Sequence, residues 1–355
     1  MIPGVPAQTE PPPPAEGRDP RPAYFALVMA TGIVSIACEH MQLEALALGL
    51  LGLNGVFFCV LWVLMARRAL RFPRAFVADL SDHSRGVGFF TWPAGTCVLA
   101  VQCMLVQPLP RLATALWALG TLLWLVLTYT VFTALTVKRS KPDLGEGLNG
   151  GWLVAVVATQ AVSSSSCLLA ARWPEHAELL LFFALGTWLS GGLLYGWLSS
   201  LVVYRWTFVP MTPEDLQPPY WINMGAMAIS TVAGCQLIAA APGSSLLQSL
   251  PPFLRGFTLL FWSAATWWIP LLLVLGAWRH LYRRYPLRYD PRYWGAVFPL
   301  GMYAVCSFEL SRALALPFLL VVPRVFVVVA LAAWTLTCFG LCRSLLTRTA
   351  ARPAA

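Results

Sequence analysis

Ten long apolar runs, separated by short polar breaks, dominate this chain of 355 residues. A helix that crosses the hydrocarbon core of a membrane needs about 20 mostly apolar residues, and every run is near that length. The runs take up most of the chain, so little room remains for a second globular domain. We predict an all-α integral membrane protein whose ten transmembrane helices span residues 24–40, 45–66, 86–106, 112–136, 149–171, 178–204, 220–241, 254–278, 293–316 and 322–343.

Charged residues make up only 11% of the chain, whereas a soluble domain carries about 25%. This deficit excludes a soluble enzyme, a disordered chain and a nucleic-acid-binding module. Residues 1–22 are rich in proline and lack the basic and apolar regions of a signal peptide. We expect a disordered cytoplasmic tail at 1–22, one transmembrane domain at 23–343 and a short cytoplasmic tail at 344–355.

The basic residues fall unevenly on the two sides of a chain that crosses ten times. Nineteen of the 24 lysines and arginines lie in the two tails or in the connections after the even-numbered runs. The other five are Arg111, Arg172, Arg255, Arg312 and Arg324. Cytoplasmic loops carry the excess of Lys and Arg, so we predict that both termini are cytoplasmic, in a bacterial inner membrane. The net charge of +9 then mainly reflects orientation.

Cysteine and histidine give no sign of a metal or redox centre. The nine cysteines all lie within apolar runs, and the four histidines lie at run ends or in loops. Membrane metalloenzymes and haem proteins need histidines that face inward from helices. We therefore expect no metal, no cofactor and no enzymatic activity.

The odd-numbered runs differ from the even-numbered ones in carrying many small and polar residues. Odd runs begin at intervals of roughly 60 to 75 residues, which favours a two-helix unit repeated five times. Polar residues within a membrane belong where they face protein or water, so the odd helices are predicted to surround a central pore. The predicted anion path consists of Thr31, Gly32, Ser35, Thr91, Pro93, Thr96, Gln160, Ser163, Asn223, Ser230, Thr231 and Pro299. Pro93 and Pro299 are expected to bend their helices.

Five stretches of the odd runs resemble one known family of membrane proteins. They are FALVMATGIVS (25–35), GFFTWPAGT (88–96), NGGWLVAVVATQ (149–160), YWINMGA (220–226) and WGAVFPL (294–300). In this order they resemble the tellurite-resistance/dicarboxylate transporter family, which includes TehA proteins, yeast malate permeases, sulfite pumps and plant slow anion channels. The motifs look most similar to those of bacterial members labelled as dicarboxylate or tellurite transporters.

The resemblance implies five hairpins with pseudo-five-fold symmetry, a homotrimer, and one pore per subunit lined by the odd helices. It also implies a phenylalanine in the ninth helix that blocks the pore, and this falls on Phe298 by motif position. Prolines within the odd runs are fewer than in the channel-like members, with none in the first and fifth.

Three functions remain open at this level. One is a passive or gated channel for small anions such as malate, chloride, nitrate, sulfite or tellurite, held by neutral hydroxyl and amide dipoles. The second is a proton-coupled dicarboxylate or sulfite carrier that uses Glu309. Glu309 and Arg312 are three residues apart and are expected to pair on one helix face. The third is a membrane-embedded enzyme or scaffold, against which the missing catalytic motifs argue.

Overall fold

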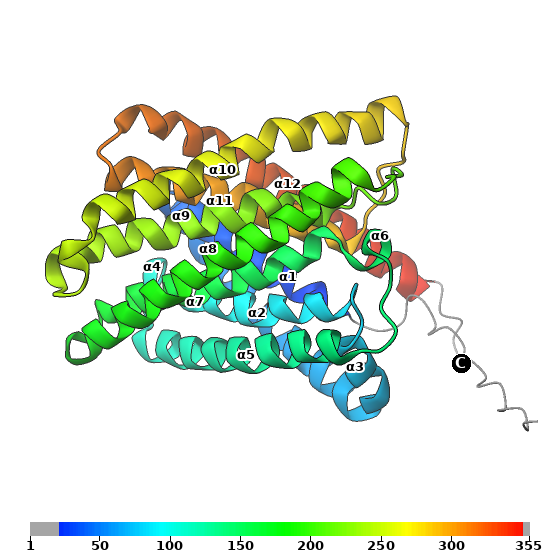
Figure 1. Ribbon diagram of the computed structural model, residues 1–355, viewed down its shortest axis with the longest axis horizontal. Helices are drawn as coiled ribbons and strands as arrows, with labels where there is room; N and C mark the ends of the chain where they lie inside the picture. Colours follow the sequence, from blue (N-terminus) through cyan, green and yellow to red (C-terminus); the bar gives the residue numbers. More distant parts are fainter. Residues whose placement is uncertain (1–20, 351–355) are drawn as a thin grey trace, which may run out of the picture.

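The computed structural model describes residues 21–350, and these fold into a bundle of ten long helices with short connections (Figure 1). Five of these ten are the shorter ones: α1 (Ala26–His40), α4 (Thr91–Leu105), α7 (Val154–Ala170), α9 (Ile222–Ala240) and α11 (Trp294–Ala313). Five are longer: α2 (Glu44–Arg71), α5 (Pro110–Val137), α8 (Ala177–Phe208), α10 (Pro251–Ala277) and α12 (Val321–Ala350). The predicted all-helical membrane protein is confirmed at this level.

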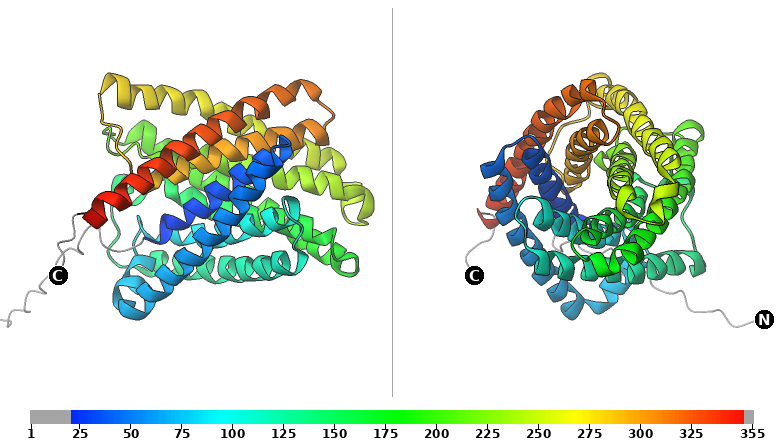
Figure 2. Two further views of the ribbon diagram at one scale, coloured as in Figure 1. Left: turned by 180° about the vertical axis from the view of Figure 1, so that it is seen from behind. Right: turned by 90° about the vertical axis from the view of Figure 1, so that its left-hand side faces the viewer.

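The short helices form an inner ring and the long helices surround it (Figure 2). In the ring, α1 packs on α4, α4 on α7, α7 on α9, α9 on α11, and α11 again on α1. Each inner helix also packs against the long helix that follows it in the chain. Burial separates the two sets, because 78–94% of the residues in the most apolar segments around α1, α4, α7 and α9 are buried, against 17–39% for the outer helices.

Nine of the helical segments in the described chain are long and apolar enough to cross a membrane. The helix α11 is not among them, although the sequence analysis predicted a span at 293–316. It carries Glu309 and is interrupted by Pro299, and both reduce its apolar character. Its membrane crossing stays a prediction.

Each inner helix begins with a short 3₁₀ turn, a common feature of helix N-termini. These turns are Pro22–Phe25, Gly86–Phe90, Gly150–Leu153, Pro218–Trp221 and Pro291–Tyr293. Three of them start with proline, whose missing N–H would have no helical partner there. The five turns are thus the same local structure repeated at the start of each inner helix.

The connections that carry most of the basic residues lie at one end of the bundle (Figure 1). Two of them contain short helices that the sequence analysis did not anticipate, α3 (Pro73–Leu80) and α6 (Leu144–Gly147). The helix α12 continues to Ala350, past its predicted end at residue 343. The predicted disordered tail lies almost entirely outside the described residues.

Close packing in the ring depends on glycine at two contacts with α11. A Cβ atom on Gly225 of α9 would lie 2.8 Å from Cγ of Pro299, and one on Gly301 would lie 2.9 Å from a methyl carbon of Ile33 in α1. Small residues let helix backbones approach closely in a membrane. These glycines therefore hold α11 against both of its neighbours in the ring.

Candidate functional site

A small, partly open cavity of about 30 Å³ lies where all five inner helices meet. Every inner helix contributes at least two residues to its wall, and all of them come from the second half of their helix or close to it. The lining residues are Ile33, Ile36, His40, Val98, Val101, Leu105, Ala161, Ser164, Ile229, Val232, Gln236, Met302, Val305 and Glu309. Contributions from a closed ring of helices place this cavity on the ring's central axis.

The cavity wall is mainly apolar and carries no lysine or arginine. Its polar members are His40, Ser164, Gln236 and Glu309. The volume has room for only one or two water molecules, too little for a hydrated anion. In this conformation the cavity is therefore too small to hold such an anion.

His40 and Glu309 approach each other across the wall between α1 and α11. The distance from His40 Nε2 to Glu309 Oε1 is 3.1 Å, and both side chains are largely buried. The His40 ring stacks on Phe308 with a centroid distance of 4.6 Å. The guanidinium of Arg312 lies over the same Phe308 ring, 5.8 Å from its centroid.

The sequence analysis expected Glu309 to pair with Arg312. In the structure its partner is His40 instead. Arg312 lies one turn after Phe308 on the helix, and its guanidinium extends back over that ring. Aromatic faces attract cations in this geometry. A partner 269 residues away in the chain is invisible to reasoning from helix spacing alone.

Phe298 is not among the residues that line the cavity, but its spacing on α11 places it on the same helix face as those that do. It precedes the lining residues Met302, Val305 and Glu309 by steps of four, three and four residues, which keeps all of them on one helix face. Its side chain is only 1% exposed. The neighbouring Pro299 lies inside the helix. Pro93, in contrast, is the third residue of α4, where a backbone N–H would have no hydrogen-bond partner within the helix.

Most of the predicted polar path residues are bonded within the helix bundle, and none of them lines the cavity. Ser35 donates to the Ala47 carbonyl of α2 at 2.7 Å. Ser163 and Gln160 donate to carbonyls of α8, those of Ala184 (2.7 Å) and Trp188 (3.0 Å). These three side chains thus connect the inner ring to the outer helices.

The remaining predicted residues show a similar pattern. Five more side chains donate a hydrogen bond to a nearby backbone carbonyl: the hydroxyls of Thr91, Thr96, Ser230 and Thr231 and the amide of Asn223. Gly32 provides space for Val98 and Asn54. Thr31 accepts a hydrogen bond of 3.0 Å from the indole N–H of Trp334 in α12.

Tryptophans of the outer helices form a set of contacts that sequence reasoning missed. Each donates its indole N–H to a hydroxyl of an inner helix. Besides Trp334 and Thr31, the pairs are Trp117 with Ser166, Trp124 with Thr159 and Trp262 with Ser307, at 2.8–3.0 Å. The signal was present in the sequence as tryptophans in the even runs opposite hydroxyls in the odd runs, but the pairing requires the fold.

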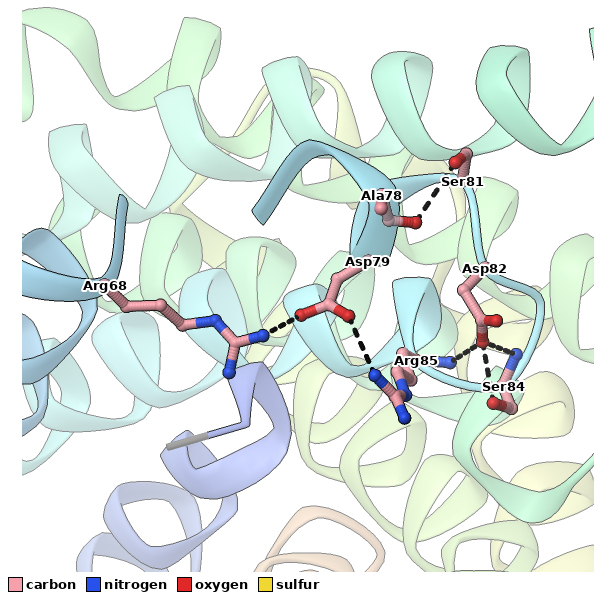
Figure 3. A network of polar contacts seen from close by, with 7 residues as sticks. All are labelled: Arg68, Ala78, Asp79, Ser81, Asp82, Ser84 and Arg85. Carbon is pink, nitrogen blue, oxygen red and sulfur yellow. Dashed lines mark hydrogen bonds and ion pairs between the residues drawn. The ribbon is translucent and has the colours of Figure 1, made fainter. Parts of the chain in front are cut away.

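An ionic network ties α2, α3 and the start of α4 together at the arginine-rich end (Figure 3). Asp79 of α3 pairs with Arg68 of α2 and, at 3.3 Å, with Arg85, which directly precedes the α4 segment. Asp79 and Arg68 are both almost fully buried. This network fixes the entry to an inner helix relative to the neighbouring outer helix.

Asp82 closes the turn between α3 and the α4 segment. It accepts hydrogen bonds from the Ser84 hydroxyl (2.7 Å) and from the backbone N–H groups of Ser84 and Arg85 (2.9 and 2.8 Å). Burial alone would raise the pKa of Asp82, but these bonds and the Arg85 charge outweigh it and lower that pKa below its ordinary value. Among the described residues, His, Cys, Asp and Glu do not gather into groups of three that could hold a metal ion.

Comparison with known proteins gives a consistent result over nearly the whole chain. A family model described as voltage-dependent anion channel matches residues 20–342. An uncharacterized membrane protein of Mycobacterium tuberculosis is 41% identical over 146 residues, which is 41% of this chain and 73% of that protein. An uncharacterized transporter of Methanocaldococcus jannaschii is 24% identical, covering 79% of this chain and 82% of its own.

A more distant relative carries a specific description. The sulfite efflux pump of Trichophyton rubrum is 19% identical over 342 residues, covering 89% of this chain and 88% of its own. The descriptions of the family and of these relatives name channels, transporters and membrane proteins, and none names an enzyme.

Proposed function

The chain belongs to the voltage-dependent anion channel family and transports anions across a lipid bilayer, and we propose that the anions cross along the axis of the inner ring, gated by Phe298. It is a transporter or channel and not an enzyme. The proposed path runs through the cavity that all five inner helices line. In this proposal the five hairpins are the repeats of a pseudo-five-fold unit, and α11 completes the ring as the tenth spanning helix.

One observation carries the gate assignment. Phe298 continues the helix face that Met302, Val305 and Glu309 present to the cavity. A large buried ring at this point, beside a proline within the helix, would occupy the axis between the cavity and the arginine-rich end. Opening would then require the ring to move, and Pro299 provides a site where α11 can bend.

The chemistry of the path follows from the absence of lysine and arginine from the cavity wall. The cavity offers Ser164 and Gln236 as neutral polar groups, and weak binding by neutral dipoles lets an ion leave as readily as it enters. The other predicted donors, such as Ser35 and Ser163, would have to give up bonds to the outer helices before they could bind an anion. We therefore propose that they serve the path only in an open conformation.

Orientation and assembly remain part of the proposal. We propose that the end with the basic connections and both termini lie in the cytoplasm of a bacterium, which the positive-inside rule supports. Arginines at this entrance would raise the local anion concentration. We propose that the protein assembles as a homotrimer with one path per subunit.

A second candidate is a proton-coupled carrier of dicarboxylates or sulfite. The observation that favours it is the His40–Glu309 approach at the cavity wall, because an ionisable pair within a membrane is a common element of proton pathways. In such a carrier Glu309 would be protonated and deprotonated during each cycle. The relative described as a sulfite efflux pump makes sulfite a reasonable substrate to test.

The two candidates differ in their response to a pH gradient. Purified protein in liposomes is tested with chloride, nitrate, malate, sulfite and tellurite, with and without an imposed gradient. A channel carries anions down their own gradient without a proton gradient, whereas a carrier needs one to accumulate substrate. Liposomes that show no flux of any of these anions above empty liposomes would contradict both candidates.

A further inference from the structure

A cleft of about 770 Å³ opens at the arginine-rich end of the bundle. Its walls are the end of α10, the connection from α10 to α11, and the segment before the turn that leads into α9. Pro218, Arg292 and Tyr293, from the turns at the starts of α9 and α11, also line it, but no residue further along those helices does. The cleft thus shares no lining residue with the axial cavity, and its size is that of a typical small-molecule site.

The cleft is strongly basic. Five arginines line it, Arg279, Arg283, Arg284, Arg288 and Arg292, against the two carboxylates of Asp290 and Glu214. Asp290 is already bound to Arg292, with distances of 2.5 to 3.0 Å between guanidinium nitrogens and carboxylate oxygens. Glu214 is exposed to solvent. Four arginines therefore face the cleft with little internal compensation.

Arg279 is the most informative of the four because it is 92% buried. Two other arginines in the described chain are buried to a similar extent, and each has a carboxylate partner: Arg68 pairs with Asp79 and Arg205 with Asp215. Arg279 forms no ion pair within residues 21–350, and its buried Nε has no hydrogen-bond partner there. A buried guanidinium without an anion is unfavourable, so this site is incomplete.

The surroundings hold Arg279 in a fixed position. Its guanidinium lies 4.4 Å above the ring of Tyr285. The backbone N–H of Tyr285 donates to the Arg279 carbonyl at 3.0 Å, and Nδ1 of His280 lies 2.9 Å from the Tyr285 carbonyl. The cation is thus presented to the cleft by a closed turn rather than by a freely moving side chain.

We propose that this cleft binds an anion of the phosphate class, with Arg279 as its buried anchor. The planar guanidinium donates two parallel hydrogen bonds to phosphate oxygens, and Arg283, Arg284 and Arg288 match a multiply charged anion. The same chemistry fits a phospholipid headgroup or a free phosphate. In either case the ligand fixes the connection between α10 and α11.

The test measures binding and not transport, so its result is independent of the proposed function. Pyrophosphate is titrated calorimetrically into the full-length protein in uncharged detergent, with chloride as the reference anion. Arg279→Gln is expected to weaken pyrophosphate binding about tenfold or more, because a hydrogen bond to a charged group contributes roughly one such factor. Arg279→Lys keeps the charge but loses the paired donors of the guanidinium. Its affinity for pyrophosphate should therefore lie between those of the unchanged protein and of Arg279→Gln.

Arg111→Gln is the matched control, since it removes an exposed arginine at the other end of the bundle, and it should bind like the unchanged protein. Equal pyrophosphate binding by the Arg279 and Arg111 variants, or no binding by the unchanged protein, would overturn the proposal. The same titration in nanodiscs separates the two sources. Loss of pyrophosphate binding when anionic phospholipid replaces phosphatidylcholine assigns the site to a lipid headgroup, and undiminished binding assigns it to a free phosphate.

Discussion

Nε2 of His40 and Oε1 of Glu309 lie 3.1 Å apart at the wall of the axial cavity, joining the first inner helix to the last. Glu309 is the only acidic residue that lines this cavity. An anion that passes it meets the carboxyl group of Glu309 with the imidazole of His40 beside it. The pair is therefore positioned to control anion passage electrostatically.

Replacing Glu309 by Gln should raise anion flux by up to about a hundredfold at neutral pH if the protein is a channel. Two like charges about 6 Å apart repel by roughly 3 kcal/mol at an effective dielectric constant near 20, and the substitution removes that barrier. Flux is measured in liposomes beside Glu44→Gln, which changes an exposed glutamate of α2. Loss of pH-driven uptake in Glu309→Gln would instead favour the proton-coupled carrier.

Asp79→Asn should lower the free energy of unfolding by about 3 kcal/mol or more. The change leaves the buried Arg68 without its carboxylate, and breaking a buried ion pair on one side typically costs 3–5 kcal/mol. Stability is measured by unfolding in a denaturing detergent. Asp143→Asn, an exposed aspartate whose side chain makes no capping bond, is the control, and equal losses in both variants would contradict the role of the network.

Asp82 predicts a dependence of stability on acid pH. Its pKa in the folded protein is lowered from 3.8, so its contribution is complete above pH 3.8 and is lost as the pH falls through the lower folded value. Asp82→Asn should cost about 1 kcal/mol at neutral pH. The difference in unfolding free energy between the unchanged protein and Asp82→Asn should shrink below pH 3.8. A difference that grows there would contradict a lowered pKa of Asp82.

Gly150 marks the close approach between the starts of α7 and α9. A Cβ atom there would lie 2.4 Å from the backbone nitrogen of Tyr220 and 2.5 Å from the Pro219 carbonyl. Because backbone cannot easily move aside, Gly150→Ala should destabilise the protein by about 1–3 kcal/mol.

Gly186 of α8 serves as the control, because a Cβ atom there meets nothing within 4 Å. Gly186→Ala should leave the melting temperature unchanged or raise it slightly, since alanine favours a helix more than glycine does. A Gly150→Ala protein as stable as Gly186→Ala would show that these two helix starts are not tightly packed.

Hydropathy predicted the helices well because the membrane leaves few alternatives to a helix. Each of the ten predicted runs overlaps one long helix of the structure, with differences of a few residues at the ends, and the odd runs form the inner set. The weakest span by hydropathy, α11, is the one that carries Phe298 and Glu309. Glu309 and Pro299 reduce the apolar character of α11, so the helix most important for the proposed path gives the faintest signal.

The direction in which side chains point was not predictable from their chemistry. Ser163 and Gln160 suggested a polar pore, but both bond to α8. The cavity wall is instead built from residues such as Ile33 and Val232, which the sequence offers no means of distinguishing from lipid-facing or core residues. A hydroxyl in a membrane helix serves helix packing as readily as an ion path.

The central claim is that anions cross along the axis of the inner ring and that Phe298 closes it. Single-channel current in a planar bilayer tests this most directly, with Phe298→Ala compared with Phe261→Ala. Phe261 is a buried phenylalanine of the outer helix α10 that packs on Trp188, so both variants lose the same ring. We predict a larger anion-selective current in Phe298→Ala alone. Currents unchanged from the parent protein in Phe298→Ala, or raised equally in both variants, would contradict the account.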